Sequence, residues 1–369
     1  MDDRISELPD DILQHILSFI DTCEVVRTSI LSKRWKHQWR FLLNKEDRIT
    51  QLPVDRTDDL RRDLLTRGPY HFVSEFLSHR DAAAPLHDFH LSLDTNLWVR
   101  KDLALVEECV LYAINQGVQS LRLHVPKDVP LRLPASLLTS TMLRELVIRQ
   151  KHQDSRVRIP ARFSLPNLKT LYLDVDLSFN YDDWMEPFSG LPELEKLSVR
   201  VSNDFVLKAP PKLRVLEIFG TSSPIRIEVI SAPLLTSFRY EGLEPFECSK
   251  MNLPMLEEVD LDIHGIIYET LKWNCVKLLH QLGNATIVSL TLNTLMILEL
   301  DGGPIEQTPP FPNLKCLKVR KGLYSDHTVH QSVMNYLTIG TLYFGSSLKV
   351  EIPRDVAVVQ QHPQVYDQL

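Results

Sequence analysis

Two pairs of histidines are the residues whose type and spacing come nearest to a metal site. His87 and His90 are separated by two residues, and so are His327 and His330. On a strand or loop this spacing does not direct both rings at one metal, and no cysteine nearby completes a tetrahedral ligand set. The sequence therefore predicts no metal site and no cofactor.

Neighbouring acidic residues are the groups that general acid–base catalysis would use. Three such groups are present: Asp182 with Asp183, Glu257 with Glu258, and Asp260 with Asp262. No glycine-rich phosphate loop, GxSxG motif or HExxH motif accompanies them. Cys316 has no evident base among its strand neighbours, which a catalytic thiol would need. Solvated surface charge is the better interpretation of the acids, and we expect a protein that is not an enzyme.

Length and composition place the chain among globular proteins. Its 369 residues are enough for one or two domains with large cores, and 44% of them are hydrophobic and 24% charged. A formal net charge of −7 argues against general nucleic-acid binding, which usually needs a basic surface.

Cysteine usage and the N-terminus indicate the compartment. The five cysteines are scattered and contain no CxxC pair, which favours reduced, buried thiols over disulfides or a zinc cluster. The chain opens with Met1, Asp2, Asp3 and Arg4, which lack the basic character of a signal peptide. The most apolar stretch, residues 286–300, contains polar residues and is too short to span a bilayer. We therefore expect a location in the cytoplasm, the nucleus or both, and no membrane contact.

Three short helices are predicted in the first forty residues. Apolar residues recur at helical spacing in the first of them, namely Leu8, Ile12, Leu13, Ile16, Leu17 and Ile20. Pro9 suits the first helical position, and Ser32 can cap the third helix, which carries Trp35 and Trp39. Helices of this size bury too little surface to be stable alone, so some of the apolar surface is expected to meet a partner. Packing of the stripe against the chain's own body is the alternative.

This segment resembles the F-box of the plant F-box/leucine-rich-repeat proteins over residues 3 to 43. The resemblance rests on DRISELPDDIL from residue 3, HILSFI from residue 15 and SKRW from residue 32, in the order and spacing of that family. It implies that the segment binds the Skp-type adaptor of an SCF (Skp–cullin–F-box) ubiquitin ligase. By the same resemblance, the first-helix contacts would be Leu8, Pro9, Ile12, Leu13, Ile16 and Leu17. Five further residues would continue or support the interface: Val25, Val26, Ile30, Trp35 and Trp39.

The rest of the chain is a repeat. The pattern L-x-x-L-x-L, with other apolar residues allowed, recurs with steps of 19 to 32 residues. Its first positions are Leu86, Val118, Leu143, Leu168, Leu194, Leu213, Leu235, Leu256, Ile287 and Leu314. In a strand the fourth and sixth positions face the same side, so stacked repeats bury one continuous parallel sheet. The longer steps leave room for helices on the outer side, such as residues 102–115 and 271–282.

The predicted fold is of the α/β class. A three-helix F-box occupies residues 1–45, and a linker or helical junction occupies residues 46–85. An irregular leucine-rich-repeat solenoid, with a parallel β-sheet and outer helices and loops, occupies residues 86–355, and residues 356–369 form a loose tail. The ninth position of the repeat usually holds Asn or Cys but here holds residues such as Lys151 and Asp176, so the curvature of the repeat is not predicted.

Side chains that alternate with the buried leucines line the concave face of such a solenoid. The residues predicted to bind a target there are Arg122, Arg149, Tyr172, Lys196, Arg200, Phe219, Arg239, Asp260 and Asp262. The early strands are mainly basic, and the strands around residues 217–262 are mainly acidic. A charge-segregated groove with Tyr172 and Phe219 as apolar anchors fits this pattern, and so does ordinary solvated charge.

The F-box resemblance and the repeat together predict a substrate-recognition subunit of an SCF-type ubiquitin ligase. Its partners would be a Skp-type adaptor, a cullin and an unknown protein target, without nucleic acid or membrane. The alternative is a small-molecule receptor on the same scaffold, as the resemblance to plant hormone-receptor F-box proteins implies. A phosphate-containing ligand of such a receptor needs several converging lysines and arginines.

Overall fold

The structure of the protein is a computed structural model. It describes residues 5, 7–19, 28, 34–35, 46–49, 77–78, 86–92, 103–125, 131, 133–150, 156–157, 162–177, 187–201, 205–221, 226–264, 275–300, 308–322, 328–342 and 348–359. The chain divides into two compact units, Met1–Asp176 and Leu177–Leu369.

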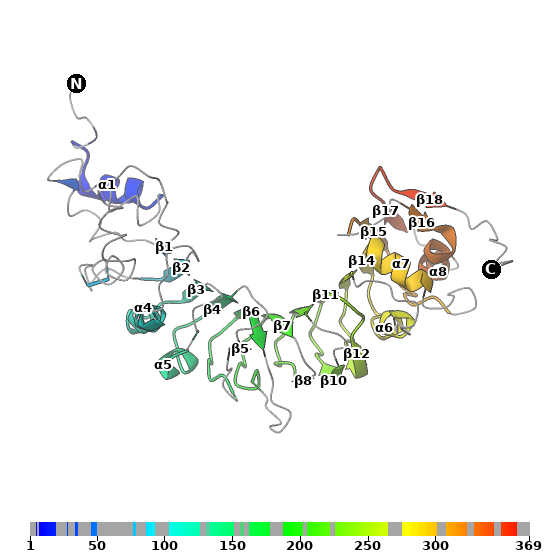
Figure 1. The fold of residues 1–369 in the computed structure, drawn as a ribbon, viewed down its shortest axis with the longest axis horizontal. Coiled ribbons are helices and arrows are strands. Elements are labelled where there is room, and N and C mark those ends of the chain that lie inside the picture. The colour runs from blue at the N-terminus through cyan, green and yellow to red at the C-terminus, as the bar shows by residue number, and fades with distance from the viewer. Residues whose placement is uncertain are drawn as a thin grey trace. The chain divides into compact units, whose positions relative to one another are not determined.

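Helix α1 (Asp10–Leu17) opens the first unit (Figure 1). Pro9 precedes it with extended backbone, and Asp10 and Asp11 lie in the first turn, where negative charge offsets the positive end of the helix dipole. The buried face of the helix carries Leu13 and Leu17, which pack with Trp35 into a small hydrophobic core. The predicted N-terminal helix is therefore present, with a core of its own.

Parallel strands make up the sheet of the first unit. In order across the sheet they are β1 (Glu46–Ile49), β2 (Asp88–Ser92), β3 (Ser120–Val125), β4 (Glu145–Gln150) and β6 (Thr170–Leu177), with β5 (Arg156–Val157) beside β6. Helices α4 (Leu103–Asn115) and α5 (Ala135–Leu138) lie in the connections. Gly117, with φ 73°, follows the end of α4 in the left-handed conformation that glycine adopts without strain. The helix expected over residues 102–115 is thus present.

The register of these strands matches the repeat. Phe89 on β2 pairs with Leu121, which pairs with Leu146, which pairs with Leu171 on β6. All four side chains are buried. The fourth positions of successive repeats therefore stack in one row of the core, as the pattern predicts.

Parallel strands also make up the main sheet in the second unit. Its strands, in order, are β7 (Lys196–Val201), β9 (Val215–Gly220), β11 (Ser237–Gly242), β13 (Glu258–Ile263), β14 (Ile287–Thr291), β15 (Cys316–Arg320) and β17 (Lys349–Glu351). Helices α6 (Cys275–Gln281), α7 (Leu292–Leu300) and α8 (Gln331–Leu342) follow β13, β14 and a short strand β16 (Thr328–His330). The helix expected over residues 271–282 corresponds to α6.

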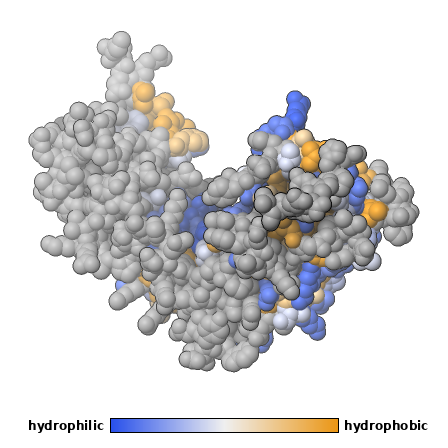
Figure 2. All heavy atoms as spheres, turned by 45° about the vertical axis from the view of Figure 1, so that its right-hand side comes forward, coloured by the Kyte–Doolittle hydropathy of each residue, from blue (hydrophilic) through white to orange (hydrophobic). Residues whose placement is uncertain are grey.

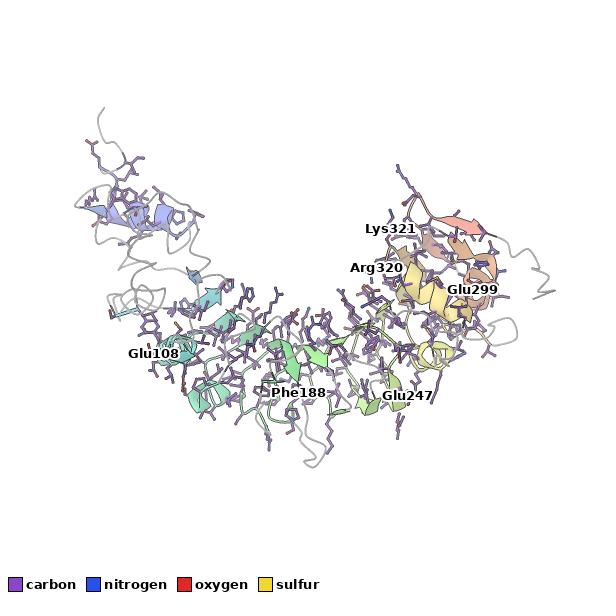
Figure 3. All side chains as sticks on the ribbon, in the orientation of Figure 1. Glu108, Phe188, Glu247, Glu299, Arg320 and Lys321 are labelled. Atoms are coloured by element: carbon purple, nitrogen blue, oxygen red, sulfur yellow. The ribbon has the colours of Figure 1, made fainter. Side chains whose placement is uncertain are left out.

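Strands, and not only helices and loops, form the outer side of the second unit. A separate parallel sheet contains β8 (Phe205–Leu207), β10 (Arg226–Ser231) and β12 (Glu247–Asn252). Figure 3 shows Arg320 on the side of this unit that carries the main sheet and Glu247 on the opposite side. The repeats that contain β8 and β10 are among the shortest steps in the sequence, so a short strand fits the return segment where a helix does not.

The two sheets of the second unit enclose an aromatic core. Phe246, just before β12, has its ring centroid 4.8 Å from that of Tyr240 and 5.9 Å from that of Phe238, both on β11. All three side chains are buried. Burial raises the pKa of the Tyr240 hydroxyl, which donates a hydrogen bond to the Glu244 carbonyl oxygen at 2.5 Å.

The repeat that was predicted to start at Ile287 is wrong by two residues. Val288 pairs with Val259, and Leu290 pairs with Leu261, so the three buried positions are Ala285, Val288 and Leu290. Ile287 is only half-buried. Nearly every residue between 285 and 300 is apolar or small, and such a run does not specify register by its pattern alone.

Two predicted boundaries also differ in the structure. Residues 46–85 were expected to form a linker or helical junction, but Glu46–Ile49 forms β1 and pairs with β2. The tail was expected to begin at residue 356, but β18 (Ala357–Val359) pairs with β16. In both places the strand bonds to a neighbour distant in sequence, which a local pattern does not reveal. None of the helices in the described ranges is both long and apolar enough to cross a membrane.

Candidate adaptor-binding and target-binding surfaces

Helix α1 has an exposed apolar face beside its buried one. Ile12 is 42% exposed, Ile16 40% and Phe19, just after the helix, 75%, whereas Leu13 and Leu17 are 0% exposed. Ile12, Ile16 and Phe19 are spaced by four and three residues and therefore lie on one side of the helix. Figure 2 shows hydrophobic side chains on the surface of this N-terminal segment. We call Ile12, Ile16 and Phe19 the apolar stripe.

Burial separates the residues predicted to contact an adaptor into two groups. Pro9, Ile12 and Ile16 are exposed. Leu13, Leu17 and Trp35 fill the core, with Leu8 packed against them, so their side chains support the fold of the segment rather than offer a surface. Val25, Val26, Ile30 and Trp39 lie outside the described residues.

Phe19 and Ile5 are exposed apolar residues that were not among the predicted adaptor contacts. Ile5 is 56% exposed, and the Phe19 ring makes an edge contact with His15 at 4.9 Å between centroids. Phe19 continues the helical spacing of Ile12 and Ile16, which is the signal that would have identified it.

An ion pair joins the first and the last of the three motifs of this segment. Arg34 donates from Nη2 and Nε to Oδ1 of Asp10, at 2.6 and 3.1 Å. Asp10 belongs to the first motif and Arg34 to SKRW, so their contact brings Trp35 beside Leu13 and Leu17. The motifs are therefore parts of one folded segment.

Comparison with known proteins identifies this segment and its body. The F-box domain family matches residues 5–47. F-box/LRR-repeat protein At3g58940 of Arabidopsis thaliana is 28% identical over 341 residues, which are 88% of this chain and 51% of that protein. F-box/LRR-repeat proteins At5g02910 and At3g60040 of the same plant are 30% and 28% identical, over 85% and 80% of this chain and 64% and 68% of their own lengths. The chain thus carries an F-box domain and is similar over most of its length to plant F-box/leucine-rich-repeat proteins. It spans about half to two thirds of the length of these relatives.

The leucine-rich repeats of this F-box protein carry paired charges on their exposed face. We define the exposed face as the side of each main sheet that bears the side chains alternating with the buried ones. In the first unit, Arg122 Nη2 donates to Glu145 Oε2 at 3.0 Å, and Ser120 Oγ donates to the same oxygen at 2.9 Å. The guanidinium of Arg149 lies 4.7 Å from the Tyr172 ring centroid.

Two imidazoles also meet on the exposed face of the first unit. His90 Nε2 and His124 Nδ1 are 3.4 Å apart, on β2 and β3. The second ring beside His90 belongs to His124, on the neighbouring strand, and not to His87, which the sequence places three positions before it. Groups of three or more potential metal ligands are absent from the part of the chain that the structure describes.

Cross-strand pairs continue along the second unit. Lys196 Nζ and Ser198 Oγ donate to the two oxygens of Glu217, at 2.8 and 2.5 Å. Burial alone would raise the pKa of Glu217, but these hydrogen bonds and the charges of Lys196 and Arg239 outweigh it, so its pKa lies below the usual value. Glu217 is therefore an ionised partner of a neighbouring strand.

The two carboxylates of strand β13, Asp260 and Asp262, also accept hydrogen bonds from other strands. Arg320 donates to Asp260 from Nη2 and to Ser289 Oγ from Nε, the latter at 2.9 Å. Burial raises the pKa of Asp260 although Arg320 and Arg239 oppose the rise. Thr291 Oγ1 donates to Asp262 at 3.1 Å.

These pairs change the interpretation of the face. The predicted basic and acidic zones place Arg122, Lys196 and Asp260 in blocks of one sign, but each has a partner of opposite charge on another strand. Glu145 was not among the predicted residues. It lies one position before the buried Leu146. The outward-facing positions of β4 alternate, so counting back two residues from Val147 would have identified Glu145. Positive and negative side chains on the exposed face are therefore joined in ion pairs and are not divided into zones of one sign.

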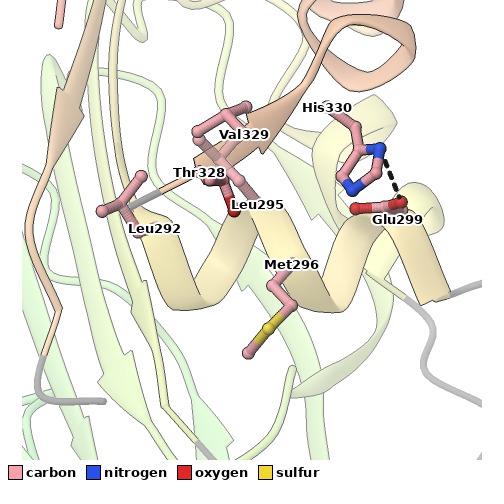
Figure 4. Close-up of a pocket in the computed structure, with 7 residues that line it drawn as sticks. All are labelled: Leu292, Leu295, Met296, Glu299, Thr328, Val329 and His330. Atoms are coloured by element: carbon pink, nitrogen blue, oxygen red, sulfur yellow. Dashed lines mark ion pairs between the residues drawn. The ribbon is translucent and has the colours of Figure 1, made fainter. Parts of the chain in front are cut away.

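A small pocket lies at the C-terminal end of the second unit (Figure 4). Its volume is about 130 Å³, and its lining residues are Leu292, Leu295, Met296, Glu299, Thr328, Val329 and His330. Glu299 Oε1 and His330 Nδ1 are 3.3 Å apart at one side of it. Of the second histidine pair noted in the sequence, His327 with His330, His327 lies outside the described residues.

The cysteines have the character of core residues. Cys109, Cys248 and Cys275 are buried, and all of the cysteines within the described ranges have free thiols. Burial raises the pKa of the Cys109 thiol to about 12 and raises that of Cys248. Thiols with raised pKa values are poor nucleophiles at neutral pH because little thiolate is present.

Proposed function

We propose that this protein is the substrate-recognition subunit of an SCF-type ubiquitin ligase. Its F-box binds a Skp-type adaptor that connects it to a cullin, and its leucine-rich repeats bind the protein to be ubiquitinated. The apolar stripe carries the proposal, because an F-box whose core is already filled by Leu13, Leu17 and Trp35 still exposes Ile12, Ile16 and Phe19. Exposed apolar surface of this kind is typical of a binding site.

The subunit itself is proposed to be non-catalytic. Its contribution is proximity, because holding the target and the ligase on one chain turns ubiquitin transfer into a local event. The transfer chemistry belongs to other subunits. Free thiols at Cys109, Cys248, Cys275 and Cys316 support a reducing compartment, so the proposed location is the cytoplasm or the nucleus.

The test is adaptor capture by the full-length chain. Ile12→Asp with Ile16→Asp places two charges on the apolar stripe without touching the core, and co-purification with a Skp-type adaptor and cullin should fall to background. The matched control is Leu234→Asp with Met255→Asp, since these residues are 43% and 52% exposed on the repeat body. The control should capture the adaptor at the wild-type level.

Circular dichroism must show that both double variants are folded. Adaptor capture by Ile12→Asp/Ile16→Asp at the wild-type level would contradict the proposal. For the target half, affinity purification with proteasome inhibition should recover the same proteins from wild type and from this variant, but only the wild type should recover them ubiquitinated.

A further inference from the structure

The pocket of about 130 Å³ lies between one face of helix α7 and strand β16 (Figure 4). Its helical wall consists of four residues at the spacing of a single helix face, namely Leu292, Leu295, Met296 and Glu299. Its strand wall consists of Thr328, Val329 and His330. The walls are largely apolar, and Figure 4 shows Glu299 and His330 turned toward each other at one end. The pocket therefore combines an apolar body with a polar end.

The polar end contains a carboxylate that accepts no hydrogen bond. Glu299 Oε1 lies 3.3 Å from His330 Nδ1, but the two atoms are not hydrogen-bonded, and His330 Nδ1 is buried without a hydrogen-bond partner. No other donor in the described part of the chain bonds to Glu299. The side chain of Glu299 is 25% exposed, so a ligand in the pocket can reach it.

The group that this end lacks is a hydrogen-bond donor, and a cationic donor suits it best. Among the described residues that line the pocket, Glu299 is the one acid, and neither lysine nor arginine is present. Histidine carries a charge only when it is protonated. A carboxylate that is largely removed from water and receives no hydrogen bond in return raises the free energy of the fold. A ligand that brings N–H donors to Glu299 removes this cost.

We propose that the pocket between α7 and β16 binds a small organic amine. Its ammonium group donates to Glu299, and its apolar part lies against Leu292, Leu295 and Val329. An ammonium group has several donors, and its hydrogen bonds to a carboxylate are stronger than those between neutral groups. Met296, half-buried and unbranched, adapts to the shape of the apolar part. This inference goes beyond the proposed function and does not depend on it.

The volume of the pocket sets the size of the ligand. An apolar cavity of about 150 Å³ holds benzene, and this pocket, of about 130 Å³, is similar. Benzylamine, a benzene ring with one aminomethyl group, therefore has a suitable size, and its ammonium group can occupy the open polar end. A ligand with so few atoms is expected to bind with a Kd on the order of 1 mM.

Benzylamine is the probe, and benzyl alcohol and benzoate are its neutral and anionic counterparts. The full-length chain is labelled at its methionine methyl groups, and Met296→Leu identifies the NMR signal of Met296. We expect benzylamine to shift this signal because an aromatic ring then lies beside the methyl group. Benzyl alcohol should bind at least about tenfold more weakly, and benzoate should leave the signal unchanged.

Variants of the chain assign the preference for an amine to Glu299. Glu299→Gln keeps the shape of the side chain but removes its charge, so benzylamine and benzyl alcohol should then bind about equally. Thr328→Phe fills the pocket from an exposed position and should prevent all three probes from shifting the Met296 signal. The matched control is Glu258→Gln, an exposed carboxylate on β13 that does not line the pocket, and it should retain the wild-type preference.

Three outcomes would overturn the inference. In the first, none of the probes shifts the Met296 signal at concentrations well above 1 mM, which would mean that water alone occupies the polar end. In the second, benzyl alcohol binds the wild type as well as benzylamine does. In the third, Glu299→Gln retains the wild-type preference while circular dichroism shows it folded. Adaptor capture should be wild-type in every pocket variant, so these outcomes leave the proposed function intact.

Discussion

Thr294, in the first turn of α7, closes the end of a strand that lies thirty-one residues earlier. Its Oγ1 accepts a hydrogen bond from the backbone N–H of Ile263 at 2.9 Å and donates to the Leu261 carbonyl oxygen at 3.3 Å. Thr294 is fully buried. The ninth position of this repeat, which usually holds Asn or Cys, is His264, and a threonine from the next repeat binds the backbone at this end of the strand.

Loss of that hydroxyl should destabilise the second unit. Thr294→Val keeps the shape of the side chain but leaves the Ile263 N–H without a partner, which should lower the free energy of unfolding by about 1–3 kcal/mol. Thr236→Val removes an exposed hydroxyl that donates to the Arg214 carbonyl oxygen and should cost less than about 0.5 kcal/mol. Urea unfolding measures both. Equal losses of unfolding free energy in the two variants would show that the buried hydrogen bonds of Thr294 stabilise the protein no more than the exposed one of Thr236.

The stacked leucines should be much less tolerant than their outward neighbours. Leu171→Ala and Leu216→Ala each leave a cavity in a fully buried row and should lower the free energy of unfolding by about 2–5 kcal/mol. Thr170→Ala, one position from Leu171 and only half-buried, should change it by less than about 0.5 kcal/mol. Similar losses at Leu171 and Thr170 would mean that the strand is not buried on one face only.

The corrected register around β14 can be checked by a pair of adjacent residues. Val288 is fully buried and Ile287 half-buried, so Val288→Ala should cost about 2 kcal/mol by lost burial and a cavity, and Ile287→Ala clearly less. Chemical denaturation of the two variants decides the matter. The opposite order would restore the repeat that begins at Ile287.

Acid should reveal the pairing of Glu217. The pKa of this group is lower in the folded protein than its ordinary value of 4.5, so its contribution to stability is present above that value and is lost as the pH falls through the folded pKa. Glu217→Gln removes the titrating group and should lose less stability than the wild type between about pH 5 and pH 3. Thermal unfolding at a series of pH values measures this difference. Parallel pH profiles for the two proteins would show that Glu217 is not the group that titrates.

The F-box and the rows of the repeat are determined by patterns local in the sequence. Helical spacing from Leu8 to Leu17 predicts α1, and the alternation in segments such as Leu168 to Leu173 predicts both the strand and its buried side. These patterns predict the element and its buried side because the direction of each side chain follows from the geometry of its own helix or strand.

Only the tertiary structure decided which apolar residues of α1 are covered. Leu13 and Ile12 are neighbours in the helical run of apolar residues that begins at Leu8, yet Leu13 is buried against Trp35 and Ile12 is exposed. The difference depends on where a segment more than twenty residues away packs, and the ion pair of Arg34 with Asp10 holds it there. Amphipathic spacing specifies that a face is apolar but not what covers it.

The charges of the exposed face show the same division. The alternation identified Lys196, Arg239 and Asp260 as outward-pointing. Read in sequence order, however, these outward charges fall into basic and acidic blocks. Lys196 meets Glu217 from a strand twenty-one residues away, and Asp260 meets Arg320 from one sixty residues away. In a parallel sheet, neighbouring strands lie about 5 Å apart and alternate strands about 10 Å apart, so the charges around each side chain are set by register and not by neighbours in the chain. For the same reason the guanidinium carbons of Arg200 and Arg239, on two other strands, lie 6.0 and 5.8 Å from the Phe219 ring centroid.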